Sequence, residues 1–331
     1  ANGVIIITTK KAKEGQTLVN INTSFGFKKV VDKVKLVNGP QFKELYSEQL
    51  ANQKDDPFDY TGWDANTDWQ DEIFQTAFIT NNNISITGAS PKHSFYLGVG
   101  YSYEQGNIEH EKFSKVTINA SNDYKITDFL KVGFQFNGAR LLPADSKQVL
   151  GALRSTPIAP VYNDEYGLYS ALPNFQKAQI NNPMVDVDLK ANTTKAENYR
   201  ASGNVYGEVD FLKHFTFKAT FSMDYASNNG RTYTPIIKVY DSTVKGDVST
   251  LGTGKTEVSQ FKENETKVQS DYVLTYTNSF DNGNHNLTAT AGFTTYYNSL
   301  SRLDGARKQG VGLVIPDDPD TVSYTHLTLP T

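Results

Sequence analysis

The feature that most constrains this chain is an alternation of apolar and polar residues with a period of two. It recurs along most of the 331 residues. In residues 113–125, for example, Val116 and Ile118 alternate with Thr117 and Asn119. This period is typical of a β-strand with one apolar and one polar face. The pattern predicts nine strands, at residues 17–28, 83–88, 93–104, 113–125, 129–141, 199–211, 215–225, 267–280 and 287–297.

The length of these segments points to a membrane wall. Most have roughly 11–14 residues, about twice the usual strand length. At ~3.3 Å per residue and a tilt near 40°, about 12 residues rise about 30 Å, the thickness of a bilayer core with its margins. Aromatic residues gather at several strand ends, as in the pair Tyr296 and Tyr297. Interfacial aromatic girdles of membrane barrels occupy such positions.

The connections between the predicted strands alternate between short and long. The short ones are 89–92, 126–128, 212–214 and 281–285, and the long ones are 29–82, 105–112, 142–197 and 227–266. Every short turn therefore falls at one end of the sheet and every long loop at the other. Outer-membrane barrels have this arrangement, with the long loops outside the cell. The sequence thus predicts an all-β fold, part of a transmembrane antiparallel β-barrel.

The composition agrees with such a wall and excludes several other classes. The hydrophobic fraction is 38%, with 19 Tyr and 19 Phe, which suits strands that need only alternate apolar residues. No apolar run approaches the ~20 residues of a membrane helix. The net charge of −4 gives no reason to expect a nucleic-acid partner, and the absence of Cys excludes disulfides and thiolate metal sites.

The long loops carry signals of their own. Residues 40–52 are predicted to form a helix that starts at Pro40 and carries one apolar stripe, Phe42, Leu45, Tyr46 and Leu50. Five prolines in 142–197 indicate a folded irregular loop. Residues 241–265 are rich in Gly, Ser, Thr, Lys and Glu, and are predicted to be exposed and mobile.

The first residues resemble a known family. The chain opens with a buried-strand motif, Ala1, Asn2, Gly3, Val4, Ile5, Ile6, Ile7 and Thr8. This motif is similar to the last plug strand of the SusC/RagA family of TonB-linked outer-membrane proteins, in which the first barrel strand follows closely. Residues 83–88 with 95–101, and residues 124–133, also resemble that family's early barrel segments. The resemblance covers about residues 1–300.

The resemblance implies import of a nutrient across the Gram-negative outer membrane through a plugged barrel of about 22 strands. It implies energy from TonB, a SusD-like surface lipoprotein as partner, and a glycan or peptide as substrate. The TonB box and most of the plug lie outside this sequence, so residues 1–11 are expected to end a plug domain and 17–321 to begin its barrel. The alternative is an outer-membrane barrel without TonB coupling, such as an adhesin or a structural protein.

The two ends of the chain suggest truncation. It starts without Met or a signal peptide. Residues 322–331 do not continue the strand pattern, and they resemble translated sequencing adapter. We therefore expect an internal fragment with a non-native tail at 322–331.

Catalytic signals are absent from the sequence. The five histidines are scattered and show no metal-ligand spacing, so we expect no enzyme, no metal and no cofactor. An acidic stretch at 55–68 suggests binding of calcium or of a polar substrate. We favour the alternative that this stretch is a solvated surface loop. Aromatic residues beside carboxylates and amides suit the faces and hydroxyls of sugars. The candidate substrate-binding residues are Tyr60, Trp63, Trp69, Tyr162, Tyr166 and Tyr169, although packing within the loops is the competing interpretation and the favoured one.

Overall fold

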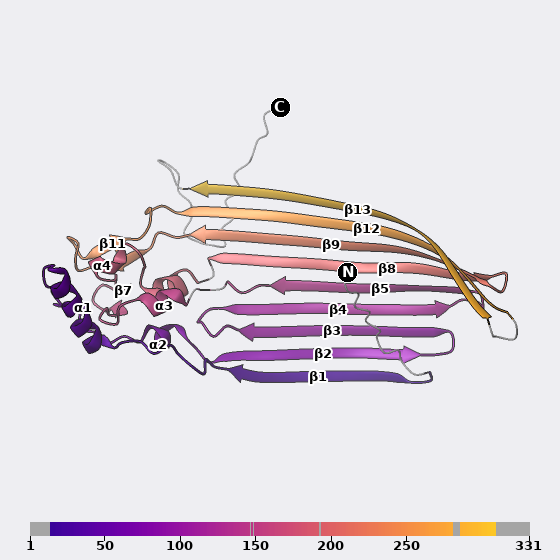
Figure 1. The fold of residues 1–331 in the computed structure, drawn as a ribbon, viewed down its shortest axis with the longest axis horizontal. Coiled ribbons are helices and arrows are strands. Elements are labelled where there is room, and N and C mark those ends of the chain that lie inside the picture. Colours follow the sequence, from indigo (N-terminus) through magenta and orange to yellow (C-terminus); the bar gives the residue numbers. More distant parts are fainter. Residues whose placement is uncertain (1–13, 146, 148, 192, 281–284, 309–331) are drawn as a thin grey trace, which may run out of the picture.

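The fold is one antiparallel sheet with a folded cap at one end (Figure 1). The computed structural model describes residues 14–308 apart from 146, 148, 192 and 281–284, so the motif at 1–8 and the tail at 322–331 lie outside the described residues. The nine predicted strands pair in chain order, and β1 and β13 are the two edges of the described sheet. The strands are β1 (Thr17–Lys28), β2 (Ala77–Ala89), β3 (His93–Gln105), β4 (Lys112–Lys125), β5 (Leu130–Leu142), β8 (Thr194–Phe211), β9 (Phe215–Thr234), β12 (Glu257–Phe280) and β13 (His285–Lys308).

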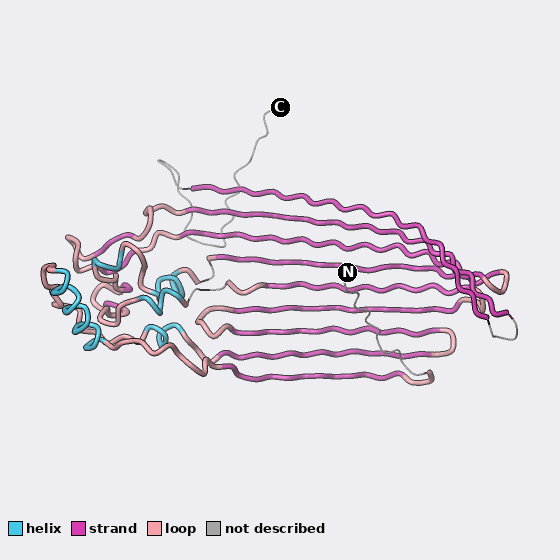
Figure 2. Tube along the Cα trace, viewed as in Figure 1, coloured by secondary structure: helices cyan, strands magenta, loops and turns pink. Residues whose placement is uncertain are grey.

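The long connections all leave the same end of the sheet, at the left of Figure 1. We call their described residues, 29–76, 106–111, 143–193 and 235–256, the first to fourth loops, and together the loop cap. The described helices and short strands lie in this cap, whereas the connections 90–92, 126–129 and 212–214 at the opposite end are tight turns (Figure 2). The predicted all-β antiparallel architecture is confirmed, although the described sheet is open rather than a closed barrel.

Strand β2 is longer than the sequence predicts. It has 13 residues and begins at Ala77, so the first loop ends at residue 76 rather than 82. The part that the sequence did not predict ends with Asn81 and Asn82, and asparagine has a low β propensity. These residues nevertheless pair with β1 on one side and with β3 on the other. Two flanking ladders therefore override a weak local preference.

The later strands also extend beyond their predicted ends. Strand β9 has 20 residues and β12 has 24, so the fourth loop spans 235–256 instead of 227–266. The part of 241–265 from residue 257 onward was predicted to be a mobile loop, and this was wrong, because it is paired strand. Apart from Tyr233, Val258 and Phe261, the added ends carry almost no large apolar residues on either face, so they show no apolar alternation although the backbone ladder continues.

The loop cap is built from short elements. The first loop contains α1 (Gly39–Gln53) and α2 (Trp69–Ile73). The third contains α3 (Leu150–Arg154), β6 (Tyr162–Asn163), β7 (Leu168–Tyr169), α4 (Asn174–Lys177) and the π-helix η1 (Val185–Leu189), and the fourth contains β10 (Lys238–Tyr240) and β11 (Val248–Thr250).

The predicted helix at 40–52 is confirmed as α1. The side chain of Asn38 accepts from the backbone N–H of Gln41, and the side chain of Gln41 accepts from the backbone N–H of Asn38. This capping box, with Pro40 in the first turn, fixes where the helix starts. None of the helices among the described residues is long and apolar enough to cross a membrane.

Candidate functional site

The sheet has one polar and one apolar face. One row of paired residues across all nine strands reads Asn20, Ser85, Gly98, Asn119, Asn137, Ser202, Asp224, Lys267 and Asn298. The next row begins Ile21, Ile84, Val99, Ile118, Gly138, Ala201 and Tyr225. Successive residues point to opposite sides of a sheet, so the two rows define its faces. Large apolar side chains stand exposed on the second face, as Phe25 does at 75%, which suits a wall whose apolar side meets lipid.

The charged residues of the polar face form cross-strand pairs. The guanidinium of Arg200 donates to Asp224 at 2.9 Å, and Nζ of Lys131 donates to Glu208 at 2.7 Å. Nζ of Lys218 lies 4.5 Å from the ring centroid of Tyr206. The two-residue period places these charges on one face, where they form pairs between neighbouring strands.

The loop cap has a hydrophobic core of its own, which draws on residues far apart in the sequence. Trp69 is 2% exposed, and its indole N–H donates to the carbonyl oxygen of Thr156 at 2.9 Å. Trp63 is also buried. The core joins the first, second and third loops through Trp63, Trp69, Ile73, Ile108, Ala152, Ile158, Ala159, Leu172, Met184 and Val187. A second cluster joins the third and fourth loops through Ala171, Val185, Ile237 and Val239.

Helix α1 is attached to this core by stacked aromatic rings. The ring of Phe175 in α4 lies 4.6 Å from that of Tyr46 and 5.3 Å from that of Phe58, measured between centroids. Phe58 in turn lies 5.0 Å from Tyr60 in an edge-to-face arrangement. Such pairs add stability beyond the area they bury, about 0.5–1.5 kcal/mol each. The first loop is therefore packed onto the third rather than free in solvent.

The candidate binding residues separate into buried and exposed groups. Trp63 and Trp69 lie in the core, and the hydroxyl of Tyr60 donates to the carbonyl oxygen of Lys43 at 3.1 Å. By contrast, Tyr162 is 44% exposed and Tyr166 is 39% exposed. Tyr60 and Tyr169 are half-buried, so Tyr162 and Tyr166 present the most aromatic surface to a ligand among the six candidates.

Two pairs of tyrosines lie in the third and fourth loops. The hydroxyl of Tyr169 donates to Asp188 at 2.7 Å, and burial together with this bond raises the pKa of Tyr169. Tyr162 packs edge-on against Tyr169, with centroids 5.2 Å apart. Tyr166 lies 5.0 Å from Tyr240 of the fourth loop, a residue that the sequence analysis did not single out. No local pattern marks Tyr240, because its place depends on contact between two loops.

Tyr166 is also tied to a carboxylate. Its hydroxyl donates to Asp247 at 3.0 Å, and this hydrogen bond raises the pKa of Tyr166. An exposed ring beside a carboxylate offers a stacking surface and a hydroxyl partner together, the combination that sugars require.

A buried ion pair closes the contact between the third and fourth loops. Asp241 is 4% exposed and accepts from Nζ of Lys177 at 2.9 Å and from the backbone N–H of Thr243 at 3.1 Å. Burial by itself would raise the pKa of Asp241. The hydrogen bonds from Thr243 and Lys177 outweigh that effect and hold the pKa below its usual value.

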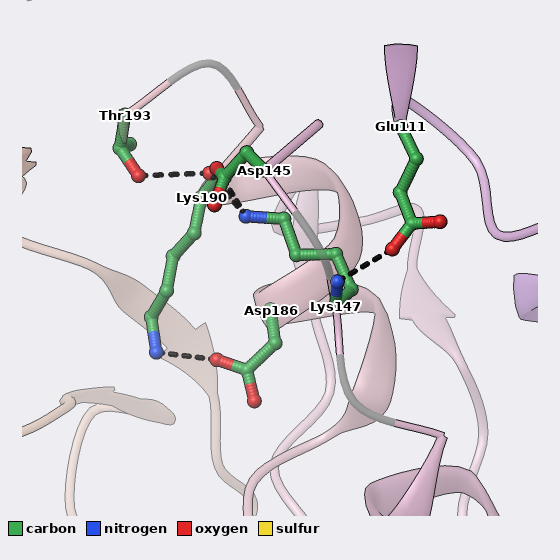
Figure 3. A network of polar contacts seen from close by, with 6 residues as sticks. All are labelled: Glu111, Asp145, Lys147, Asp186, Lys190 and Thr193. Carbon is green, nitrogen blue, oxygen red and sulfur yellow. Dashed lines mark hydrogen bonds and ion pairs between the residues drawn. The ribbon is translucent and has the colours of Figure 1, made fainter. Parts of the chain in front are cut away.

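A polar network fastens the base of the third loop (Figure 3). Nζ of Lys147 donates to Asp145 at 2.8 Å and to the carbonyl oxygen of Lys190 at 3.0 Å. The backbone N–H of Lys147 donates to Glu111 of the second loop at 2.6 Å. Lys190 also pairs with Asp186 within the third loop. Both ends of the loop are thereby held together and to the second loop.

The acidic stretch of the first loop does not converge on a metal. Asp68 caps α2 by accepting from Gln70, and Asp59 accepts from the N–H of Thr61. Across the described residues, no group of three or more His, Cys, Asp or Glu is placed to hold a metal ion. An open groove of about 680 Å³ lies beside this stretch, between residues 33–38, the start of α2 and residues 153–157.

Comparison with known proteins places this architecture among outer-membrane receptors. No protein-family model matches the chain. It is 30% identical over 309 residues to TonB-dependent receptor P3 of Formosa agariphila, covering 89% of this chain and 28% of the relative. It is 29% identical over 268 residues to TonB-dependent receptor SusC of Bacteroides thetaiotaomicron, covering 72% of this chain and 26% of the relative. The chain thus spans about a quarter of the length of these relatives.

Solved structures show the same fold. The RagAB peptide importer in its closed-closed state aligns with a TM-score of 0.72 at 18% identity, covering 91% of this chain and 37% of that one. Its open-open state aligns with a TM-score of 0.70 at 17% identity, covering 95% and 38%. The resemblance to SusC/RagA proteins inferred from the sequence is confirmed by relatives that are TonB-dependent receptors, SusC among them.

Proposed function

This chain corresponds to part of a TonB-dependent receptor of the SusC/RagA type, and on that premise we propose that it forms nine consecutive wall strands and the loop cap of a nutrient importer in the Gram-negative outer membrane. One observation carries the proposal: a sheet with one lipid-compatible face has every long loop at the same end. In this assignment the polar face lines the barrel interior, residues 1–11 end the plug, and the loop cap faces the outside of the cell.

We propose that the substrate is a glycan or a peptide and that it first meets the exposed tyrosines of the third loop. The reachable rings of Tyr162 and Tyr166, with Asp247 beside them, support this. The burial of Trp63 and Trp69 supports a packing role for these two. A SusD-like lipoprotein is the proposed partner at the loop end, with TonB acting from the periplasm through a plug.

Uptake and binding by the full-length receptor test the proposed substrate contact. Replacing Tyr162 and Tyr166 together by Ala is expected to weaken substrate binding roughly five- to 150-fold, since each stacked ring contributes about 0.5–1.5 kcal/mol. The Phe variants at both positions keep the rings and serve as the matched control. Unchanged uptake in the Ala variant would remove these residues from the proposal.

Two further measurements test the assignment as a whole. The receptor should migrate differently on a gel before and after boiling, as folded outer-membrane barrels do. Uptake should also stop in cells that lack TonB. A folded barrel whose uptake persists without TonB would favour the alternative, a barrel with no energy coupling. Co-purification of a surface lipoprotein from cells that express the receptor tests the proposed partner.

A further inference from the structure

The apolar face of the sheet changes character where the strands enter the loop end. Six neighbouring strands, β4, β5, β8, β9, β12 and β13, each carry a basic residue there. By the two-residue period these residues share the face of Val116, Gly138 and Tyr225. We call this set the basic collar: Lys112, Arg140, Lys195, Arg231, Lys262 and Arg307.

At the loop end of these strands, acidic residues lie mainly on the face opposite the basic collar. In the described strand ends 112–116, 138–142, 194–199, 225–234, 257–266 and 297–308, the collar face carries one acidic residue, Glu197. The opposite face of the same ends carries Glu257, Glu263, Glu265 and Asp304 among its basic residues. A solvated surface with no role has no reason to separate charges in this way, so the collar faces something anionic.

An apolar groove lies directly below the collar. It has a volume of about 600 Å³ and opens on the apolar face, where Gly138 and Ala201 leave the surface low. Val116, Ile118 and Tyr225 form its walls. Arg140 stands at its loop end, bonded to Glu197 at 2.5 Å and lying 5.9 Å from the ring centroid of Tyr199. The apolar groove and the positively charged collar therefore lie next to each other on the same face of the sheet.

We propose that this surface binds a phosphorylated glycolipid of the outer leaflet, with an acyl chain in the groove and its phosphates against the basic collar. The inference rests on the proposed function, because it needs the loop end to face outward. A free anion would use the collar and leave the groove without a role, whereas a neutral lipid would do the reverse. A lipid with a phosphorylated sugar headgroup matches both, since arginine and lysine pair with phosphate oxygens.

The test uses full-length receptor in detergent and lipid A as the probe, titrated at low salt. The variant Lys262→Gln with Arg307→Gln removes two collar charges. Each basic side chain near a lipid surface contributes roughly a fivefold gain in affinity, so binding should weaken at least tenfold. The matched control, Lys115→Gln with Lys308→Gln, removes two charges from the opposite face and should bind like the wild type. Equal binding by the collar variant and the wild type overturns the proposal.

Two arms of the test identify the ligand. Dephosphorylated lipid A should bind weakly to every form of the receptor. Ala201→Leu fills the groove, and it should weaken binding of lipid A while the collar remains. If inorganic phosphate displaces lipid A completely at millimolar concentration, the collar is a site for soluble anions and the lipid assignment fails. The gel shift on boiling, recorded for each variant, reports the barrel itself, so failure of the proposed function is seen separately.

Discussion

A single buried side chain fixes how the chain enters the first loop. Gln70 is 3% exposed, and its side-chain amide accepts from the backbone N–H of Val34 at 3.0 Å and donates to the carbonyl oxygen of Val34 at 2.8 Å. The glutamine thus takes the place of a neighbouring strand, because it satisfies both backbone groups of one extended residue. Residues 29–38 have no regular secondary structure, and this pair of bonds holds them against the loop cap.

Replacing Gln70 by Leu should release that segment. The side chain keeps its approximate size but loses both hydrogen bonds, which costs about 1–2 kcal/mol because water reaches the exposed Val34. Backbone hydrogen exchange in residues 29–38 should then rise roughly tenfold. Gln49→Leu, on the exposed side of α1, is the control and should leave this exchange unchanged. Equal protection in Gln70→Leu and the wild type would contradict the assigned role.

The turn between β8 and β9 holds two side chains in an unfavourable backbone conformation. Leu212 and Lys213 have φ angles of 48° and 61°, in the left-handed region that glycine adopts without cost. Lys213→Gly should therefore stabilise the folded barrel by about 1 kcal/mol, measured by urea unfolding in lipid vesicles. Lys92 lies in another turn without a positive φ, so Lys92→Gly should give no gain. A stabilisation shared by both variants would point to a cause other than backbone strain.

At the scale of elements, β10 of the fourth loop meets the third loop through an ion pair. Asp241 follows β10 directly, and its partner Lys177 ends α4. The folded pKa of Asp241 lies below its unfolded value, so the carboxylate contributes stability that is complete above the unfolded pKa. That contribution is lost as the pH falls through the folded pKa, when protonation removes the charge that Lys177 faces.

The fourth loop should therefore loosen in acid. Proteolysis within 235–256 should accelerate as the pH falls below about 4, the unfolded pKa of an aspartate. Asp241→Asn leaves Lys177 without its charged partner and should loosen the loop by about 1–3 kcal/mol at neutral pH, with no further acid step in this range. Asp32→Asn, an exposed change in the first loop, is the matched control. An acid step that survives in Asp241→Asn would locate the titrating group elsewhere.

At the scale of elements, the sequence predicts what is local and misses what is distant. All nine strands and α1 follow from alternation, turn lengths and caps, which neighbouring residues determine. The loop ends of β9 and β12 could not be predicted in this way, because their mainly polar residues show no apolar period. The packing of residues inside the loop cap could not be predicted either. The hydrogen bond from Trp69 to Thr156 and the packing of Tyr46 against Phe175 join residues that no local pattern relates.

The same limit applies to the candidate site. Aromatic residues beside carboxylates drew attention to the first and third loops, and the proposed substrate contact lies in the third. The sequence alone left open which of these residues pack and which are exposed. Burial of Trp63 and exposure of Tyr162 are decided by where the loops meet. The partner of Tyr166, Tyr240, enters from another loop altogether.

The whole molecule is organised by the difference between its two faces. Val205 and Asn204 are adjacent on β8 and point to opposite sides, Val205 beside Phe134 and Phe221 and Asn204 beside Gln135 and Ser222. Neither face of the sheet has a packed core of its own among the described residues. In the proposed assignment, the stability of the wall comes from its surroundings, with lipid on one side and water or the plug on the other.

One pair of substitutions distinguishes the faces directly. Val205→Arg places a charge on the lipid side and should destabilise the barrel by about 2–4 kcal/mol if it lies near mid-membrane. Asn204→Arg places the same charge one residue away on the polar face and should cost about 1 kcal/mol or less. Urea unfolding in vesicles, or the amount of receptor in the outer membrane, measures the difference. If Asn204→Arg destabilised the barrel more than Val205→Arg, the assignment of the two faces to lipid and interior would be the wrong way round.

The shared core of the loop cap has a consequence for how such a receptor can be altered. The first, second and third loops meet in one cluster, and the third and fourth in another. A single loop grafted from a relative would bring half of each contact and leave the other half unmatched. Exchange of the four loops as a set keeps those contacts intact. Chimaeras designed to redirect specificity should fold when all four loops are exchanged and fail when one loop is exchanged alone. The loop sequences of such proteins are therefore expected to diversify together.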